Sequence, residues 1–237
     1  MIAIVTGAAR GIGEAIARRL HADGYEVALA DLADAEPVAS DLGEGARAYT
    51  LDVRDPTSWE RLLGALDGDA YALVNNAART EFRTFWEIDL DEWDDVLATN
   101  LRGTYLGCRA VGRALRERGR GRIVNLASDA AFAASGGSGV HYAASKAGVV
   151  AVTRRAATEL APHGVTVNAV APAAIDGPLA QDVLRDRLDE KLADIPVSRL
   201  GPRRGGGGHR LVPPLRRRRL HHRGDARRQR RRRDAVK

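Results

Sequence analysis

The 237-residue sequence contains a single cysteine, Cys108, and few aromatic residues, which make up 5% of the chain. One cysteine excludes an internal disulfide bond and any metal site built from several cysteines. No apolar run approaches the length of about 18 residues that a membrane-spanning helix needs. The first residues lack the basic start and long apolar segment of a signal peptide. We therefore expect a soluble, cytoplasmic protein with no membrane association and no metal ion.

Charge is distributed unevenly along the chain, although the formal net charge is only +6. Residues 201–237 contain 15 Lys and Arg but only 2 Asp and Glu, a balance of +13. Subtracting these from the totals of 37 and 31 leaves 22 basic and 29 acidic residues in 1–200, a balance of −7. The hydrophobic content of 44% is normal for a globular protein. We expect one large domain over 1–200, followed by a basic tail over 201–237.

The start of the chain has the pattern of a nucleotide-binding turn. Residues 2–5 are apolar and partly β-branched without alternation, which is typical of a parallel strand buried on both faces. Thr6-Gly7-Ala8-Ala9-Arg10-Gly11-Ile12-Gly13 follows, and then a helical pattern through Leu20. Glycines in this context let the backbone approach a pyrophosphate, whose charge meets the N-terminus of the helix. The alternative is an ordinary tight turn between a strand and a helix.

The second expected strand, residues 26–30, ends at Asp31, 18 residues after Gly13. A carboxylate at this position can accept hydrogen bonds from both hydroxyls of an adenosine ribose and would repel a 2′-phosphate. The sequence therefore favours NAD over NADP. Arg10 in the glycine-rich turn could instead help to hold a phosphate, and Asp31 could simply be the N-cap of a helix.

The remaining pattern alternates strands and helices, which indicates βαβ units with right-handed crossovers. We expect a Rossmann-type doubly wound parallel sheet with helices on both faces. The further strands are expected at residues 46–51, 71–74, 122–127 and 165–170. Helices are expected at residues 56–66, at 89–118 with a break or bend near Asn100 and Gly103, at 142–160 and at 182–192.

Tyr142 and Lys146 lie four residues apart in a helical stretch and therefore on one helix face. A phenol with a pKa of about 10 is a poor base at neutral pH, and an ammonium nearby lowers that pKa. The pair can make a proton-transfer group. Taken alone, it is more often two neighbours on a solvated helix.

Seven motifs now stand in order, and together they resemble the short-chain dehydrogenase/reductase family over about residues 2–200. They are Thr6-Gly7-x-x-x-Gly11-Ile12-Gly13, Leu51-Asp52-Val53, Asn75-Asn76-Ala77, Asn100, Ser128, Tyr142-x-x-x-Lys146 and Asn168-x-x-x-Pro172. One motif would be weak evidence, but seven in the family's order and at nearly its spacing are highly specific.

The resemblance implies a catalytic set of four residues. Tyr142 would exchange a proton with the substrate oxygen, and Lys146 would lower its pKa and hold the nicotinamide ribose. Ser128 would hydrogen-bond the reacting oxygen, and Asn100 would hold a water that links Lys146 to solvent. Ser128 as a strand-end cap and Asn100 as the support of a helix bend are the structural alternatives.

The resemblance also implies which residues bind an NAD or NADP cofactor. Asp52 and Val53 would lie along the adenine, and Asn75 and Ala77 would line the cofactor cleft. The full expected set is Gly7, Arg10, Gly11, Ile12, Gly13, Asp31, Asp52, Val53, Asn75, Ala77, Tyr142, Lys146 and Pro172.

The chain departs from the family pattern at a few places. Ala78 and Ala173 stand where glycines are usual, and both are small enough for the cleft to survive. The segment between Ser128 and Tyr142 is about one residue longer than usual. Asp129 places a negative charge near the substrate pocket, which disfavours acidic substrates.

From Pro202 the sequence changes character, and the family's seventh strand is not recognisable. One interpretation is a disordered basic arm that binds nucleic acid or acidic surfaces. We favour a shift of reading frame near Gly201, because the residue types of this tail are compatible in order and spacing with an out-of-frame family ending. The tail as written should be disordered. It should leave strand six as an uncovered edge and impair stability, assembly and activity. Resequencing across 195–210 and trypsin digestion test this.

The sequence thus predicts an NAD(P)-dependent oxidoreductase that interconverts an alcohol and a carbonyl. A 3-oxoacyl thioester reductase, a sugar or secondary-alcohol dehydrogenase and a steroid or xenobiotic dehydrogenase all remain open. The resemblance implies a homodimer or homotetramer. The alternative is a non-catalytic nucleotide-binding protein with a nucleic-acid-binding tail. Residues after 200 contain no aromatic side chain for base stacking, so nucleic acid is not an expected partner.

Overall fold

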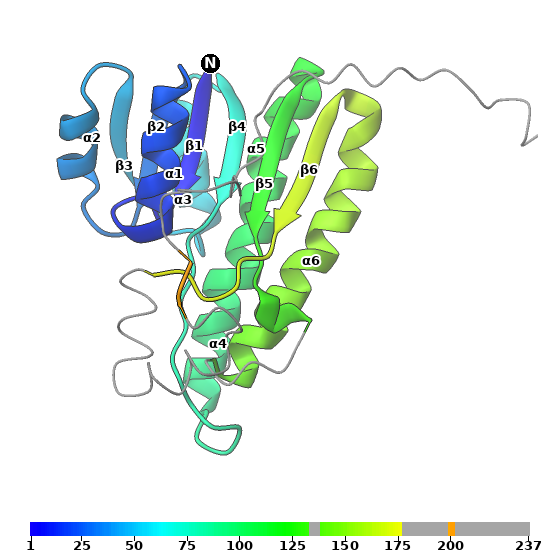
Figure 1. The fold of residues 1–237 in the computed structure, drawn as a ribbon. Helices are drawn as coiled ribbons and strands as arrows, with labels where there is room; N and C mark the ends of the chain where they lie inside the picture. The colour runs from blue at the N-terminus through cyan, green and yellow to red at the C-terminus, as the bar shows by residue number, and fades with distance from the viewer. Residues whose placement is uncertain (133–137, 177–198, 202–237) are drawn as a thin grey trace, which may run out of the picture.

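The computed structural model describes residues 1–132, 138–176 and 199–201. In this part of the chain, six parallel strands form one sheet in the order β3-β2-β1-β4-β5-β6 (Figure 1). Their bounds are β1 Ile2–Thr6, β2 Glu26–Asp31, β3 Ala46–Thr50, β4 Ala70–Asn75, β5 Gly121–Leu126 and β6 Val165–Val170. The chain reverses its direction of growth between β3 and β4, so the switch point lies between β1 and β4. Open α/β sheets bind ligands at such a point.

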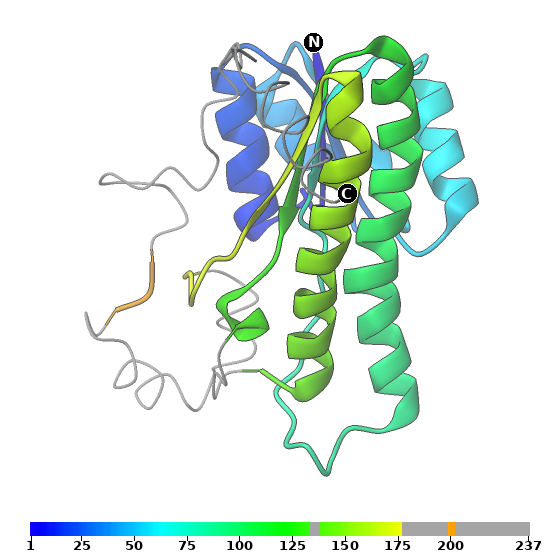
Figure 2. The same cartoon turned by 90° about the vertical axis from the view of Figure 1, so that its right-hand side faces the viewer.

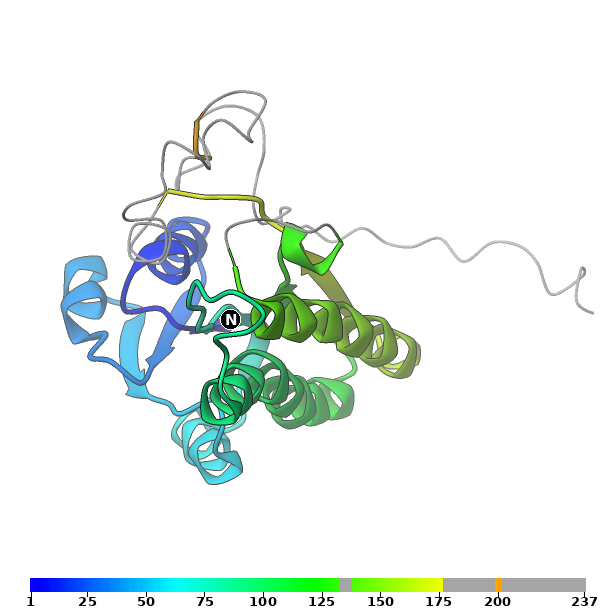
Figure 3. The same ribbon diagram turned by 90° about the horizontal axis from the view of Figure 1, so that it is seen from below.

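Helices cover both faces of the sheet. Viewed from below, α3, α5 and α6 lie on one side of the strands and α1 on the other (Figure 3). Their bounds are α1 Gly11–Ala22, α2 Glu36–Leu42, α3 Pro56–Ala65, α4 Leu90–Leu97, α5 Gly103–Arg118 and α6 Val140–Leu160. Short 3-10 turns occupy Asp129–Ala131 and Ala161–His163. Helices α5 and α6 run side by side (Figure 2). The arrangement confirms the expected doubly wound fold.

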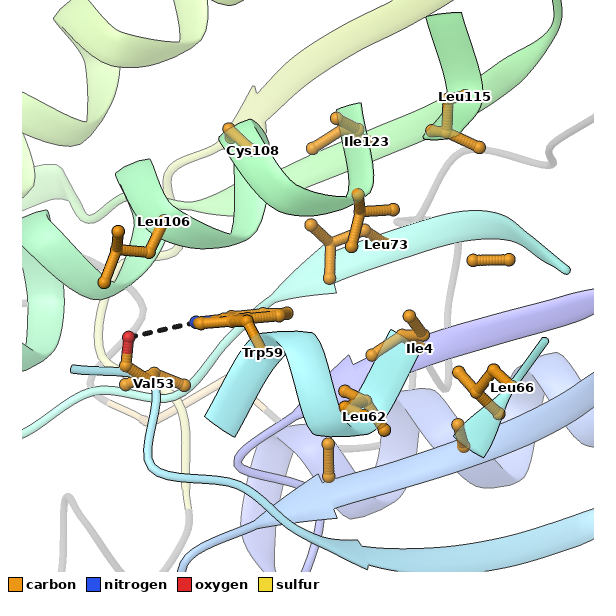
Figure 4. Packing of buried hydrophobic residues seen from close by; sticks show 14 of the residues in the cluster. Ile4, Val53, Trp59, Leu62, Leu66, Leu73, Leu106, Cys108, Leu115 and Ile123 are labelled. Atoms are coloured by element: carbon orange, nitrogen blue, oxygen red, sulfur yellow. Dashed lines mark hydrogen bonds between the residues drawn. The ribbon is translucent and has the colours of Figure 1, made fainter. Parts of the chain in front are cut away.

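Two apolar cores hold the layers together, one on each face. The first lies beneath α3 and α5, where Trp59 is 1% exposed and packs among aliphatic side chains from β1 and β4 (Figure 4). The indole Nε1 of Trp59 donates a hydrogen bond to the main-chain oxygen of Val53 at 3.1 Å. This bond ties the loop after β3 to the core. The second core packs α1 and α2 against the other face of β1, β2 and β4.

The strands and most helices lie within a residue or two of the positions predicted from the sequence. The expected bend near Asn100 is a π-helical turn, Ala98–Arg102, between α4 and α5. Helix α2 was not predicted, because seven residues are too short to show a convincing helical period. The alternative interpretation of Asp31 as a helix N-cap is wrong, since the N-cap of α2 is Ala35.

Strand β6 pairs with β5 alone among the described residues. The expected helix at 182–192, the missing seventh strand and the disordered tail all concern residues outside the described part of the chain. Gly201 lies beside Ile175 in an isolated parallel bridge, where its N–H donates to the oxygen of Ala174 at 2.9 Å. None of the described helices combines the length and apolar content needed to cross a bilayer.

Candidate active site

A cleft of about 740 Å³ lies where the loops after all six strands meet. In Figure 1 this is the lower edge of the sheet, to which the strand arrows point. Twelve of the residues singled out from the sequence line it, namely Gly7, Arg10, Gly11, Ile12, Asp31, Asp52, Val53, Ala77, Ser128, Tyr142, Lys146 and Pro172. Ala78 and Ala173, which replace the family's glycines, line it too. The fold therefore brings into one cavity most of the residues predicted from separate motifs.

The glycine-rich turn is shaped by close backbone approach. Gly7 and Gly11 have φ values of +66° and +68°, which side chains other than glycine rarely adopt. A Cβ at Gly13 would lie 1.9 Å from the oxygen of Gly7. Gly13 thus does not line the cleft but lets α1 pack against the turn. Helix α1 has no side-chain cap at Arg10, so its first N–H groups remain available to an anion in the cleft.

Asp31 connects the end of β2 to the glycine-rich turn. Its Oδ2 accepts a hydrogen bond from the N–H of Ala9 at 2.8 Å, and its Oδ1 accepts one from Ala33 at 3.0 Å. The carboxylate lines the cleft. Its charge is therefore fixed next to the turn in which a cofactor pyrophosphate would be expected.

An ion-pair network not predicted from the sequence crosses the cleft beyond Val53. Arg54 makes a bidentate contact with Asp52, with bonds of 2.9 and 2.8 Å, and donates to Asp95 of α4 at 2.7 Å. Asp95 also pairs with Arg79, which follows β4. These four side chains all line the cleft. The network links the loop after β3 to the loop after β4 through α4. The pairing with Arg54 keeps the pKa of Asp52 below its usual range.

The two asparagines at the end of β4, Asn75 and Asn76, point in different directions. Asn75, expected to line the cleft, is 4% exposed and does not line it. Its amide Nδ2 donates to Asn125 at 2.8 Å in the core. The side chain of Asn76 instead reaches the turn, donating to the oxygens of Thr6 and Gly7 at 2.9 and 3.0 Å. The correction follows from strand geometry, because successive side chains point to opposite faces.

Asn100, in the π-helical turn, is fully buried. Its side chain accepts from the N–H of Arg79 at 2.7 Å and donates to the oxygen of the same residue at 2.8 Å. It also donates to Ser145 on α6 at 3.0 Å. Asn100 thus holds the loop after β4 against α6, and its side chain lies behind the cleft rather than in its lining.

Ser128, Tyr142 and Lys146 meet at one end of the cleft. The ammonium of Lys146 lies 5.5 Å from the centre of the Tyr142 ring and donates to the oxygen of Leu126 at 2.7 Å. Lys146 is 3% exposed, and burial lowers its pKa to about 8.

The pKa of Tyr142 is governed mainly by burial in this structure. Burial raises the pKa of the Tyr142 phenol; a hydrogen bond with Ser128 lowers it, and the negative charge of Asp129 raises it. Desolvation of the phenolate is the largest of these influences, and the ammonium of Lys146 is directed to the oxygen of Leu126. Tyr142 is therefore protonated at neutral pH.

A buried pair fixes the start of the helix that carries Tyr142. His141 is fully buried, and its Nε2 lies 2.8 Å from Oε1 of Glu92 on α4. No local sequence pattern indicates this contact, because the two residues are 49 positions apart and belong to different helices. The pair joins α6 to α4 next to Tyr142, near the end of the cleft that Ser128 and Lys146 also line.

A parallel sheet with a glycine-rich turn and a cleft at its switch point defines a nucleotide-binding α/β protein. The chain belongs to the short-chain dehydrogenase family, whose model matches residues 1–188. It is 36% identical over 205 residues to 3-oxoacyl-[acyl-carrier-protein] reductase FabG of Escherichia coli, with 84% of each chain covered. It is 34% identical over 209 residues to 3-alpha-(or 20-beta)-hydroxysteroid dehydrogenase of Mycobacterium bovis, covering 84% of this chain and 80% of that one.

The fold is shared with solved structures of the same family. A proposed NAD(P)-dependent gluconate 5-dehydrogenase from Beutenbergia cavernae, with NADP bound at low occupancy, superposes with a TM-score of 0.79 and is 34% identical. The similarity covers 85% of this chain and 84% of the other. The relatives are oxidoreductases that act on hydroxyl or carbonyl groups, which makes this chain a member of an oxidoreductase family.

Proposed function

We propose that the protein interconverts an alcohol and a carbonyl compound with a nicotinamide cofactor. The observation that supports this most directly is the convergence of Ser128, Tyr142 and Lys146 in the same cleft as the glycine-rich turn. An acid/base group and an anion-binding turn in one cavity are what hydride transfer with a dinucleotide requires.

The nicotinamide, when bound, accepts or supplies the hydride, and the chain supplies the proton. Tyr142 gives its proton to the carbonyl oxygen in reduction and takes it back from the alcohol in oxidation. Ser128 donates a hydrogen bond to the same oxygen as negative charge develops on it. Lys146 holds positive charge beside the phenol, which stabilises the phenolate once a proton has left.

Asn100 and its π-helical turn would hold a water that links Lys146 to solvent. The main-chain oxygen of Asn100 accepts a hydrogen bond from Thr104 at 2.7 Å, and the side chain is occupied by Arg79 and Ser145. The proposed water would therefore use the second lone pair of the Asn100 main-chain oxygen. A solvent-isotope effect that changes on substitution at Asn100 would support this relay.

The glycine-rich turn fits a dinucleotide, because Gly7 and Gly11 line the cleft without side chains and the start of α1 has no side-chain cap. We propose NAD as the preferred cofactor, because the carboxylate of Asp31 would repel a 2′-phosphate. Asp52 and Val53 would lie along the adenine. Arg10 is exposed at the rim of the cleft and would contact the phosphates of either cofactor.

The similarity leaves three substrate classes, which are a 3-oxoacyl thioester, a sugar or other secondary alcohol, and a steroid. In this family the loop after strand six, here 173–195, is expected to determine substrate specificity, and it lies mostly outside the described residues. Cytoplasmic location, a domain over 1–200 and a separate tail over 201–237 remain parts of the proposal. Self-association is supported by exposed apolar side chains around α4, where Trp86 and Leu90 are 89% and 80% exposed. Light scattering would measure the oligomeric state.

The test is oxidation of a panel of secondary alcohols with NAD and NADP, together with reduction of the matching ketones. Tyr142→Phe should abolish turnover while NAD binding, measured by calorimetry, is retained. Tyr105→Phe is the matched control, because Tyr105 is half exposed on α5 and lies outside the cleft. The panel should be run on the chain as written and on one with the reading frame restored after Gly201. Failure of both chains with every alcohol and ketone would rule the proposal out.

The alternative, a non-catalytic protein that binds nucleotide and nucleic acid, has a separate signature. It requires a salt-sensitive shift with random-sequence DNA that is lost when residues 202–237 are removed. NAD binding without turnover by either chain would favour it.

A further inference from the structure

Asp129 is placed at the reacting end of the cleft, directly after Ser128. Its N–H donates to the oxygen of Pro172 at 3.1 Å, which anchors it between the ends of β5 and β6. Its Oδ1 accepts hydrogen bonds from the Ser128 hydroxyl at 2.9 Å and from the N–H of Ala130 at 2.8 Å. A carboxylate therefore lies within one hydrogen bond of the hydroxyl proposed to hold the reacting oxygen.

Asp129 differs from the other carboxylates that line the cleft. Asp52 and Asp95 are paired with arginines, and both oxygens of Asp31 accept backbone N–H groups. Within the described residues, Asp129 has no cationic partner, and its Oδ2 receives no hydrogen bond. A partly buried carboxylate oxygen without a donor is unfavourable unless solvent or a ligand supplies one. Asp129 thus offers the cleft an acceptor that no described residue uses.

We propose that Asp129 is a specificity-determining residue that accepts a hydrogen bond from a second hydroxyl of the substrate, on the carbon next to the reacting one. The substrate class is then a neutral vicinal diol in oxidation and the matching α-hydroxyketone in reduction. This rests on the proposed function. The spacing fits, because Oδ2 belongs to the carboxyl group whose Oδ1 lies 2.9 Å from Ser128 Oγ, and oxygens on adjacent carbons of a diol are similarly close.

The charges around Asp129 select a hydroxyl over the other groups. A carboxylate on the substrate would be repelled by Asp129. An ammonium would be attracted to Asp129 but would enter a site that already holds the buried cation of Lys146. A hydroxyl donates the hydrogen bond without either cost.

The same contact affects Ser128. The Ser128 hydroxyl donates to Oδ1 of Asp129 at 2.9 Å, so the carboxylate competes with a reacting oxygen for this proton. When a substrate hydroxyl donates to Asp129, it weakens the hydrogen bond from Ser128 to the carboxylate. Ser128 is then free to donate to the substrate oxygen. A simple alcohol lacks that second donor and must compete with Asp129 for Ser128.

The test compares butane-2,3-diol with butan-2-ol, which differ by the second hydroxyl alone, using the full chain in both reading frames. Wild type should prefer the diol in kcat/KM, and Asp129→Asn should reduce the diol-to-alcohol ratio by about 10-fold or more. Asp129→Ala should act in the same direction, and thermal melting checks that both variants fold. Asp91→Asn is the control, since Asp91 is exposed on α4 and outside the cleft.

An unchanged ratio in folded Asp129→Asn would overturn the inference while leaving the oxidoreductase intact. A preference of wild type for 3-aminobutan-2-ol over the diol, lost in Asp129→Asn, would overturn it in favour of a cationic substrate. If no alcohol or ketone reacts, the proposed function fails. Asp129 is then judged by calorimetry of the diol and the alcohol in the presence of NAD. Selective diol binding lost in Asp129→Asn supports the inference, and equal binding overturns it.

Discussion

Gly13 packs directly against the carbonyl of Gly7, so closely that a Cβ at position 13 would lie 1.9 Å from the Gly7 oxygen. The same Cβ would lie 2.6 Å from Nδ2 of Asn76, the side chain that holds the turn against β4. The first turn of α1, the glycine-rich turn and the loop after β4 thus share one contact. The position of the uncapped N–H groups at the start of α1 depends on this contact.

We predict that Gly13→Ala weakens both the fold and cofactor binding. The added methyl group must push the turn away from α1, and overpacking of this kind costs about 1–3 kcal/mol. Urea unfolding measures the loss of stability, and calorimetric titration with NAD measures the loss of affinity. Gly64→Ala is the matched control, because a Cβ there meets open space on helix α3. It should raise stability by about 0.5–1 kcal/mol. Wild-type affinity in Gly13→Ala would contradict the proposed position of the pyrophosphate.

Asp31 should decide between NAD and NADP. Asp31→Asn keeps an oxygen that can accept from Ala9 but loses the charge that would repel a 2′-phosphate. NAD affinity should fall about 10-fold, because hydrogen bonds to a charged acceptor are lost, and NADP affinity should rise. Titration with both cofactors measures this directly. Asp34→Asn controls for the lost charge, since Asp34 accepts a hydrogen bond from the main-chain N–H of Glu36 and does not line the cleft. Equal effects of the two substitutions would show that general charge, not this site, sets the preference.

Asn100 should contribute to stability apart from any part in catalysis. Asn100→Ala removes three hydrogen bonds of a buried side chain and leaves the N–H and oxygen of Arg79 without this partner. A loss on the order of 3 kcal/mol is expected, measured by urea unfolding without substrate or cofactor. Asn168→Ala, on the exposed face of β6, should change stability by less than about 0.5 kcal/mol. Wild-type stability of Asn100→Ala would show that the Asn100 side chain does not support the helix bend.

What could be predicted from the sequence, and what could not, follows the range of the interactions involved. Buried strands and the glycine-rich turn are local, since apolar runs and glycine spacing determine them within a few residues. The ion pairs of Asp95 with Arg54 and Arg79 join helix α4 to the loops after β3 and β4, and no local pattern encodes them. Which of Asn75 and Asn76 points into the core depends on where β4 ends, because successive side chains of a strand point to opposite faces. The sequence pattern does not define that end to the residue. The pKa of Tyr142 depends on burial, a property of the assembled fold.

Lys146 should make stability depend on pH. Its pKa is lowered from 10.5 in the unfolded chain to about 8 in the fold, because burial disfavours the ammonium. Below pH 8 Lys146 is protonated in both the folded and the unfolded state, and the full cost of burying its ammonium destabilises the fold. Between 8 and 10.5 the unfolded state binds more protons, so this cost diminishes as pH rises. The stability of wild type relative to Lys146→Met should therefore increase over this range, by on the order of 3 kcal/mol. A difference that stays constant with pH would show that Lys146 is better solvated than the structure indicates.

The pH dependence of turnover should reveal the state of Tyr142. Because burial raises its pKa, the phenol is protonated at neutral pH and ready to act as the acid in carbonyl reduction. Alcohol oxidation needs the phenolate, whose population rises about tenfold per pH unit below the pKa. Oxidation should therefore accelerate with pH while reduction stays flat until the phenol ionises. Asp129 raises the same pKa, so Asp129→Asn should shift the rising limb to lower pH. An ultraviolet titration of wild type minus Tyr142→Phe measures this pKa without turnover. A phenol that ionises at the same pH with and without the Asp129 charge would show that the carboxylate is screened from Tyr142 and acts on Ser128 alone.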